Sequence, residues 1–282
     1  MAEGAGMSGG RGAWAEPGGW GEWLPALVSE AGKLGVGLDA NQARLLLEYG
    51  RLLGTEARMA GLTAVVDPEG VVHKHLVDSV AGWRALAREV RARHESGGGG
   101  GSLVDVGSGG GLPGIPLAIL LRGLGWRVAL VEATGKKADF LRRCVARLSL
   151  SHVEVISRRA EEVGRNDAWR QSFDAAVARA VGPMPVVLEY CLPLVRLGGC
   201  AVLYRGPRGR EEAKEWQNAA ERLGGRLEGV DEFVLPSGGE GRSLVVFRKT
   251  QETPQEFPRR AGVPQRRPLG CARAWRCSAA TV

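Results

Sequence analysis

A glycine-rich run in the middle of the chain is the segment whose residues most clearly suit ligand binding. It follows an apolar stretch, residues 102–106, and places glycine at Gly107, Gly109, Gly111 and Gly114. Glycines so spaced let the backbone turn tightly, and without a Cβ they let a ligand approach the main chain. A helix that starts after such a turn adds free N–H groups. We therefore predict that this segment holds a flat or anionic group of a nucleoside cofactor.

Two kinds of cofactor fit the glycine spacing. The pattern Gly109-x-Gly111-x-x-Gly114 satisfies the dinucleotide fingerprint, and Glu132, at the end of the next expected strand, suits ribose hydroxyls in either case. Asp105 distinguishes the two, because a carboxylate at the strand tip would repel a pyrophosphate and attract the α-ammonium of S-adenosylmethionine. We therefore expect S-adenosylmethionine, with Asp105 in contact with it. The structural alternative is that Asp105 only caps the following helix.

Short apolar segments alternate with helical patterns beyond residue 101. The predicted strands are residues 102–106, 126–132, 153–156, 173–178, 200–204, 232–235 and 243–248. The predicted helices between them are residues 113–121, 136–148 and 186–195. This alternation is typical of βαβ crossovers, so we expect an α/β, Rossmann-like fold with a mainly parallel seven-stranded sheet. The last two strands leave no room for a helix, so the C-terminal strand should pair antiparallel.

Composition divides the chain into segments of different character. They are a Gly-rich leader at 1–22, a small helical N-terminal subdomain at 23–96, a Gly linker at 97–101, a cofactor-binding domain at 102–249 and a basic Pro/Arg-rich tail at 250–282. The leader cannot offset the entropy lost on ordering it, so we expect disorder there. Asp39 followed by Gln42 indicates a capping box within the helical subdomain.

The overall composition is that of a globular protein with a basic surface. The chain has 282 residues, 44% of them hydrophobic, and a net charge of +7. This balance favours a polyanionic partner, because Lys and Arg displace counterions from phosphates. Neither an apolar run long enough to cross a membrane nor a secretory signal stands out, so we expect a cytoplasmic protein without a membrane partner.

Metal binding has little support in the sequence. The five cysteines are scattered without a Cys-x-x-Cys pair, which argues against zinc and against a disulfide framework. His73 and His75 lie two apart, and on a helix that spacing points them in different directions. We expect His75 instead to form a hydrogen bond with Asp78, its i+3 neighbour.

Several segments taken together resemble one protein family. They are Asp105 through Leu117, Leu130-Val131-Glu132, Lys136-Lys137, Arg159-Ala160-Glu161, Phe173-Asp174 and Ala178-Arg179-Ala180, with His75 through Ser79 upstream and Arg242-Ser243-Leu244 downstream. This combination resembles the glucose-inhibited division protein B family across residues 40–269. The resemblance implies a class I methyltransferase fold, S-adenosylmethionine as cofactor, and methylation of guanine N7 in small-subunit (16S) ribosomal RNA.

The resemblance also implies roles for individual positions. Gly107 and Leu112 would line the methionine and ribose side of the cofactor, and Glu132 would accept hydrogen bonds from the ribose. Ala160 and Glu161 would flank the adenine. The predicted cofactor site comprises these positions together with Asp105, Gly109 and Gly111.

Arg179, after the fourth strand, is the candidate catalytic residue. It matches a family position that contacts the cofactor and faces the catalytic mouth, although a surface arginine in a salt bridge is the structural alternative. Guanine N7 already carries a lone pair, so methyl transfer to it is an in-line displacement that needs no general base. We therefore expect catalysis by positioning, without a catalytic triad.

The predicted RNA contacts are Lys136, Lys137, Arg205 and Arg208. A solvated surface explains each cluster equally well, but their shared position near the carboxyl ends of a parallel sheet favours RNA. The expected partner is the small ribosomal subunit, and we expect a monomer. Two other functions stay open: an NAD-dependent oxidoreductase, against which Asp105 argues, and a non-catalytic RNA-binding assembly factor.

Overall fold

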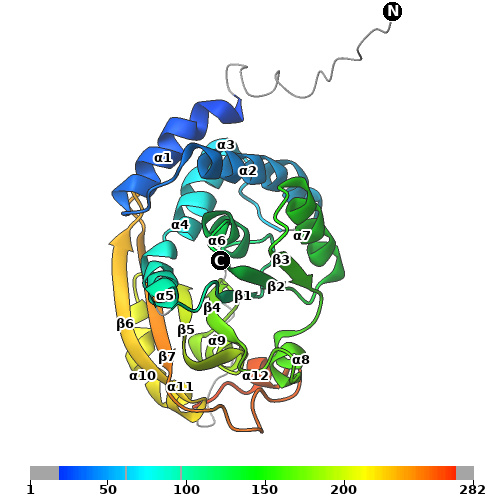
Figure 1. Cartoon of the computed structure of the whole chain (residues 1–282), viewed down its shortest axis with the longest axis vertical. Coiled ribbons are helices and arrows are strands. Elements are labelled where there is room, and N and C mark those ends of the chain that lie inside the picture. Colours follow the sequence, from blue (N-terminus) through cyan, green and yellow to red (C-terminus); the bar gives the residue numbers. More distant parts are fainter. Residues whose placement is uncertain (1–18, 61, 96, 271–282) are drawn as a thin grey trace, which may run out of the picture.

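The computed structural model describes residues 19–60, 62–95 and 97–270. Its centre is a seven-stranded sheet of order β3-β2-β1-β4-β5-β7-β6, with helices on both faces (Figure 1). The strands are β1 (Ser102–Val106), β2 (Arg127–Val131), β3 (Val153–Ile156), β4 (Phe173–Arg179), β5 (Val195–Arg205), β6 (Gly225–Val234) and β7 (Gly241–Lys249). Strands β1 to β5 pair parallel, and β7 runs antiparallel to β5 and β6. The predicted fold class is therefore confirmed.

Helices lie before, between and after the strands along the chain. Those before the sheet are the 3-10 helix η1 (Trp20–Trp23), α1 (Leu24–Lys33), α2 (Ala40–Ala60), α3 (Pro68–Gly70), the π-helix η2 (Val71–Val77), α4 (Asp78–Val80) and α5 (Trp83–Glu95). The later ones are α6 (Gly114–Leu121), α7 (Gly135–Arg147), α8 (Ala160–Arg165), α9 (Met184–Cys191), α10 (Gly209–Glu215), α11 (Gln217–Arg222) and α12 (Val263–Arg266). Across the described residues, none of these helices is long and apolar enough to span a bilayer.

Alternate residues along the strands contribute side chains to two apolar cores, one on each face of the sheet. In β1, Leu103 joins the core that contains Phe140 of α7, and Val104 joins the core that contains Val187 of α9. This is the period-two alternation expected of a strand with both faces covered. Helices α1, α2, α4 and α5 add side chains to the first core. The N-terminal helices therefore form a layer of the same fold.

The predicted leader extends too far into the chain. Residues 1–18 lie outside the described residues, but Trp20 belongs to η1 and packs against α2. A Cβ at Gly50 would lie 2.9 Å from the Trp20 ring, and one at Gly54 would lie 3.0 Å from it. The indole therefore rests where glycine leaves room, and the expectation of disorder is wrong for residues 19–22.

Residues 250–270, which we call the C-terminal strap, pack on the outside of the second core. Phe257 and Leu269 are buried in that core. The rest of the predicted tail, residues 271–282, lies outside the described residues. A segment predicted from its charge as a basic tail thus contributes apolar side chains to the fold.

Gly114, the first residue of α6, permits a close approach between helix and sheet. A Cβ at this position would overlap Leu130 and would lie 2.5 Å from Oδ2 of Asp105. We expect Gly114→Ala to lower the free energy of unfolding by about 1–3 kcal/mol, because both neighbours are packed in the core. Urea denaturation measures this change.

Gly135→Ala is the matched control. Gly135 begins α7, and a Cβ there would meet nothing within 4 Å. The control should leave stability unchanged or raise it by up to about 1 kcal/mol, since alanine favours helix. Equal destabilisation by the two substitutions would contradict the packing argument.

Candidate active site

The glycine-rich run forms the loop between β1 and α6. Gly107, Gly109 and Gly111 have φ angles of +73°, +56° and +96°, a region that residues with a Cβ rarely adopt. A Cβ at Gly107 would also lie 2.8 Å from Cγ2 of Val181. The backbone conformation therefore requires these glycines, and their lack of side chains leaves the main chain of the loop open to a ligand.

Glu132 holds this loop from the end of β2. Its Oε2 accepts a hydrogen bond from the Gly109 N–H at 2.9 Å, and its Oε1 accepts one from the Thr134 N–H at 2.7 Å. Each carboxylate oxygen has two lone pairs, so both can accept further bonds. Glu132 can thus hold the loop and bind ribose hydroxyls at the same time.

A small cavity of about 130 Å³ opens at the carboxyl ends of β1 and β2. Four residues predicted to bind the cofactor line it together: Gly107, Glu132, Ala160 and Glu161. Open α/β sheets bind their ligands at this end of the strands. The fold therefore gathers residues that are distant in sequence at the place where such a fold holds a ligand.

The other predicted loop residues stand apart from this cavity. Gly109, Gly111 and Leu112 belong to the loop but not to the cavity wall. Leu112 instead packs against the first core. Their contact with a cofactor stays a prediction.

Further residues of the cavity wall were not predicted from the sequence. Val181, after β4, and Tyr190, in α9, both line the cavity, as does Gln265 of α12. None of them lies in a recognisable motif, and Gln265 comes from the strap. A local pattern could not have revealed a contact made by so distant a segment.

Asp105 lies behind the glycine loop rather than in the cavity wall. Its side chain is fully buried, and its Oδ2 accepts a hydrogen bond from the Gly114 N–H at 3.0 Å. Alternation along β1 explains the difference, because the side chain of Val106 faces the cavity and that of Asp105 points to the opposite face. This contact matches the structural alternative, in which Asp105 caps the helix that follows the loop. A direct contact with a ligand stays a prediction.

Burial also changes the chemistry of this carboxyl group. It raises the pKa of Asp105 to about 7, although the hydrogen bonds at Ser108 and Gly114 oppose the shift. Its other oxygen, Oδ1, is buried and has no hydrogen-bond partner among the described residues. A buried acceptor without a donor suits an N–H group brought by a ligand.

Arg179 ends β4 and joins the sheet to the N-terminal helices. Its Nη1 donates to Oδ2 of Asp78 at 2.9 Å and to Oγ of Ser79 at 3.3 Å. The Arg179 side chain is only 14% exposed, so this salt bridge is largely buried and not at the surface. Arg179 does not line the small cavity. Its catalytic role and its contact with the cofactor stay predictions.

His75 contacts Arg179 rather than Asp78. Its Nδ1 lies 3.5 Å from Nη2 of Arg179, and its Nε2 lies 2.9 Å from Oγ1 of Thr63. The predicted bond with Asp78 is wrong because His75 lies in the π-helix η2, whose wider turn changes the i, i+3 geometry. Burial, together with the charge of Arg179, lowers the pKa of His75 to about 4, so its ring is neutral at pH 7. No three His, Cys, Asp or Glu residues gather as a metal site in the described part of the chain.

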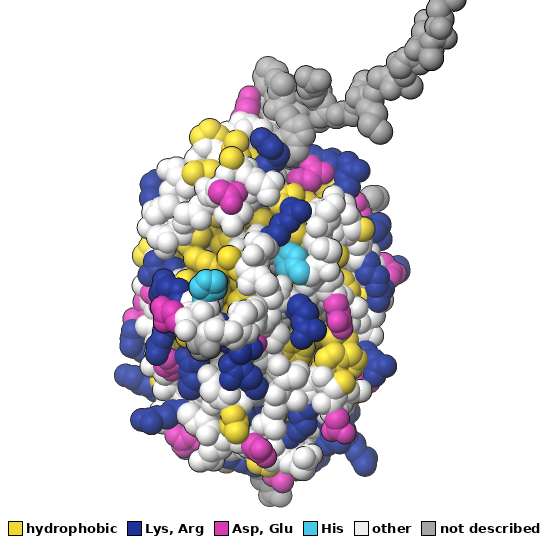
Figure 2. All heavy atoms as spheres, viewed as in Figure 1, with side chains coloured by type: hydrophobic (Ala, Val, Ile, Leu, Met, Phe, Trp, Pro, Cys, Tyr) yellow, Lys and Arg dark blue, Asp and Glu magenta, His cyan; other side chains and the backbone are white. Residues whose placement is uncertain are grey.

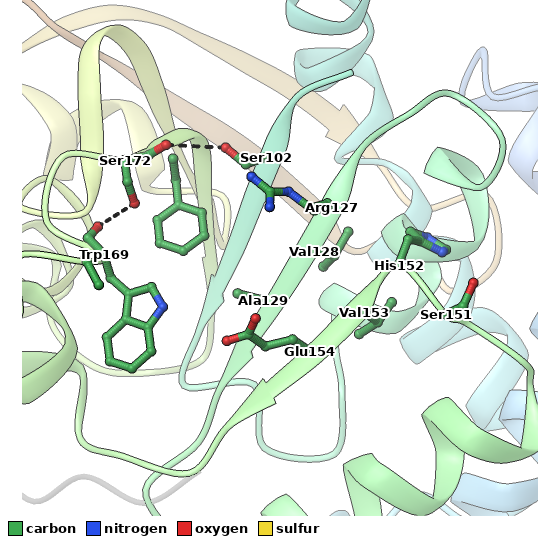
Figure 3. Close-up of a pocket in the computed structure, with 12 residues that line it drawn as sticks. Ser102, Arg127, Val128, Ala129, Ser151, His152, Val153, Glu154, Trp169 and Ser172 are labelled. Carbon is green, nitrogen blue, oxygen red and sulfur yellow. Dashed lines mark hydrogen bonds between the residues drawn. The ribbon is translucent and has the colours of Figure 1, made fainter. Parts of the chain in front are cut away.

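A larger cavity, of about 410 Å³, lies near the amino ends of β2 and β3 (Figure 3). Arg127, His152, Glu154 and Trp169 are among the residues that border it. None of the predicted site residues lines this cavity. Because parallel sheets bind ligands at their carboxyl ends, the smaller cavity is the candidate active site.

Comparison with known proteins points to one family. The family model described as rRNA small subunit methyltransferase G, or GidB, matches residues 42–238. The chain belongs to the GidB family. Membership in a methyltransferase family decides against the oxidoreductase alternative.

Individual relatives agree with the family match. The chain is similar to ribosomal RNA small subunit methyltransferase G of Pelotomaculum thermopropionicum, with 43% identity over 85% of this chain and 95% of the relative. The protein of the same name from Rubrobacter xylanophilus is 47% identical over 83% of this chain and 87% of the relative. Among solved structures, a 16S rRNA adenine-N1 methyltransferase from Catenulisporales acidiphilia has 15% identity and a TM-score of 0.44, covering 58% of this chain and 93% of its own.

The basic residues predicted to bind RNA differ in their availability. Lys136 and Arg208 are exposed, and Lys137 is half-buried in the first turn of α7. Arg205 is only 13% exposed and donates to Oε2 of Glu212 at 2.9 Å, so we leave it out of the proposed RNA contacts. Figure 2 shows Lys and Arg spread over the visible face with Asp and Glu among them, rather than gathered in one patch.

Asp105→Asn tests the buried carboxyl group. With its pKa raised from 3.8 to about 7, the group makes a contribution to stability that is fully present below about pH 4 and is lost as the pH rises through 7. Asparagine keeps an oxygen for the Gly114 N–H but does not titrate. We therefore expect the variant to lose less stability than the wild type between pH 4 and pH 8, measured by urea denaturation. Identical pH profiles would show that Asp105 titrates normally.

Proposed function

We propose that this chain transfers a methyl group from S-adenosylmethionine to N7 of a guanine in the 16S ribosomal RNA of the small subunit. The observation that carries the proposal is the match of residues 42–238 to a family described as rRNA small subunit methyltransferase G. The candidate cavity at the carboxyl ends of β1 and β2 supports it, because that is where an open α/β fold binds a cofactor.

The residues around the small cavity suit S-adenosylmethionine. Glu132 would accept hydrogen bonds from the ribose, and Ala160 with Glu161, next along the sheet edge, would flank the adenine. Gly107 and Leu112 would lie on the methionine side. When bound, the cofactor supplies a methyl group on a cationic sulfonium, and the acidic side chains near the loop favour its positive charge.

The buried oxygen of Asp105 adds support for a cationic ligand. An α-ammonium beside the loop would place a positive charge near this carboxyl group, whose Oδ1 has no hydrogen-bond partner among the described residues. A positive charge there would also favour the ionised carboxylate and lower its pKa from about 7. Cofactor binding would then remove part of the cost of burying this group.

The chain's own residues have to position the base rather than remove a proton. Guanine N7 carries a free lone pair, and holding it in line with the methyl group contributes on the order of 7 kcal/mol when alignment is good. We assign the orientation of the base to Arg179, whose guanidinium is fixed by Asp78. The neutral ring of His75 beside it adds no competing charge at pH 7.

The remaining proposals concern the partner and the organisation of the chain. Lys136, Lys137 and Arg208 would contact RNA phosphates and so orient the substrate. We propose a monomer acting in the cytoplasm, with residues 102–249 as the cofactor-binding domain and residues 23–96 as its helical subdomain.

Incubation with small ribosomal subunits tests the activity directly. Subunits from a strain that lacks this protein should gain label from S-adenosylmethionine, and digestion should yield N7-methylguanine by nucleoside mass spectrometry. Subunits from a strain with the protein are the control and should gain little label, since the site is already modified. RNA binding without any methyl transfer would favour a non-catalytic assembly factor instead.

Reversing the charge of both Lys136 and Lys137 to Glu should weaken binding to 16S RNA. The loss of phosphate contacts should also reduce the salt slope, log Kd against log salt concentration, by about 1 for each contact. Arg122 and Arg127 are exposed near the amino end of β2, away from the candidate site, and their double replacement by Glu is the matched control. An equal loss of affinity in both variants would show that only net charge matters.

A further inference from the structure

The C-terminal strap is fastened to the second face of the domain by a series of polar contacts. Arg170 donates from Nη2 to the carbonyl of Thr253 at 2.6 Å and from Nη1 to the carbonyl of Phe257 at 2.6 Å. Phe257 itself is buried. Thr253 also donates from Oγ1 to the Leu223 carbonyl at 2.7 Å. The first half of the strap therefore follows a defined path.

A buried ion pair fixes the next part of the strap. Arg259 binds the carboxylate of Glu189 with its backbone N–H and with Nε, each at 2.8 Å from Oε1. Its Nη2 lies 2.5 Å from Oε2 of the same carboxylate. Glu189 is fully buried in α9, so this guanidinium is its charge partner away from water. The strap is thus anchored next to the cavity wall.

Beyond this anchor the strap reaches the candidate active site. The N–H of Gly262 donates to Oε1 of Glu161 at 2.8 Å, and Glu161 lines the cavity. The short helix α12 then begins, lies against α9, and brings Gln265 to the same cavity (Figure 1). The strap therefore supplies part of the wall on the side of Ala160 and Glu161.

The order of residues along the carboxyl ends of the strands indicates which part of a bound cofactor would lie next to Gln265. The glycine loop follows β1, Glu132 follows β2, and Ala160 follows β3, which is the next strand outward. If Glu132 holds the ribose of the cofactor and the methionine end faces the glycine loop, then the base lies toward β3. Gln265 borders the cavity three residues beyond Gly262, which binds Glu161, and it is exposed, so its amide is available to a ligand.

We propose that Gln265 recognises the adenine base of S-adenosylmethionine through its side-chain amide. The inference rests on the proposed function. A carboxamide offers an acceptor and a donor side by side, and adenine presents a matching N6 amino donor and N7 acceptor along one edge, where the base of an inosine ligand has two acceptors. A site built for these bonds disfavours a base that lacks the amino group. Gln265 would therefore determine specificity for the base, while the glycine loop and Glu132 hold the rest of the cofactor.

Calorimetric titration with two ligands tests this role. S-adenosylhomocysteine has the 6-amino group, and S-inosylhomocysteine carries a carbonyl oxygen in its place. We expect Gln265→Ala to weaken binding of the adenosine ligand by about tenfold and to change that of the inosine ligand much less. The preference of the wild type for adenosine should thus largely disappear. Gln265→Glu should weaken the adenosine ligand further, because it loses the amide N–H donor and adds charge near Glu161.

Gln255→Ala is the control, since Gln255 is an exposed glutamine of the same strap that does not line the cavity. It should bind both ligands as the wild type does. Unchanged affinities in Gln265→Ala, or an equal loss for both ligands, would overturn the role of Gln265 in base recognition. A wild-type protein that binds neither ligand would overturn the proposed function itself, which separates the two failures.

Discussion

The contact between the Asp105 carboxylate and the Gly114 N–H fixes where β1 ends relative to where α6 begins, and the candidate site depends on that geometry. With both ends of the loop held, the chain has few residues in which to reverse direction, and left-handed φ angles are the result. Glu132 secures the middle of the loop from the neighbouring strand. An acidic side chain in β1 and another just after β2 therefore hold a loop that is rich in glycine.

The N-terminal helices take part in this arrangement as well. Tyr49 of α2 donates to the carbonyl of Gly110 at 2.6 Å, and Asp78 pairs with Arg179 at the end of β4. Tyr204 of β5 donates to the carbonyl of Ser79 at 2.6 Å. The helical layer thus contacts the glycine loop and two strand ends with polar groups, beyond sharing an apolar core with the sheet. A displacement of these helices would move the loop and Arg179 together.

Local patterns predicted the parts of the structure that local forces determine. The bounds of β1 and β3 match the predicted residues, because each is a short apolar run between turn residues. Helices α10 and α11 were not predicted, since they contribute few apolar side chains, such as Ala213 and Ala219, among many charged ones. Alternation along β1 puts the side chains of Asp105 and Val106 on opposite faces, and the prediction from the charge of Asp105 did not take this into account. The pairing of Arg179 with Asp78 joins distant segments, and nothing in either segment indicates the other.

The path of the strap also bears on how the protein is made. A chain leaves the ribosome with its N-terminus first, so the strands β1 to β4 emerge well before residues 250–270 do. Until then Glu161 lacks the Gly262 N–H and Glu189 lacks its arginine. The wall of the candidate cavity is therefore completed only after residues 262–265 have left the ribosome, well after the strands that carry the rest of it.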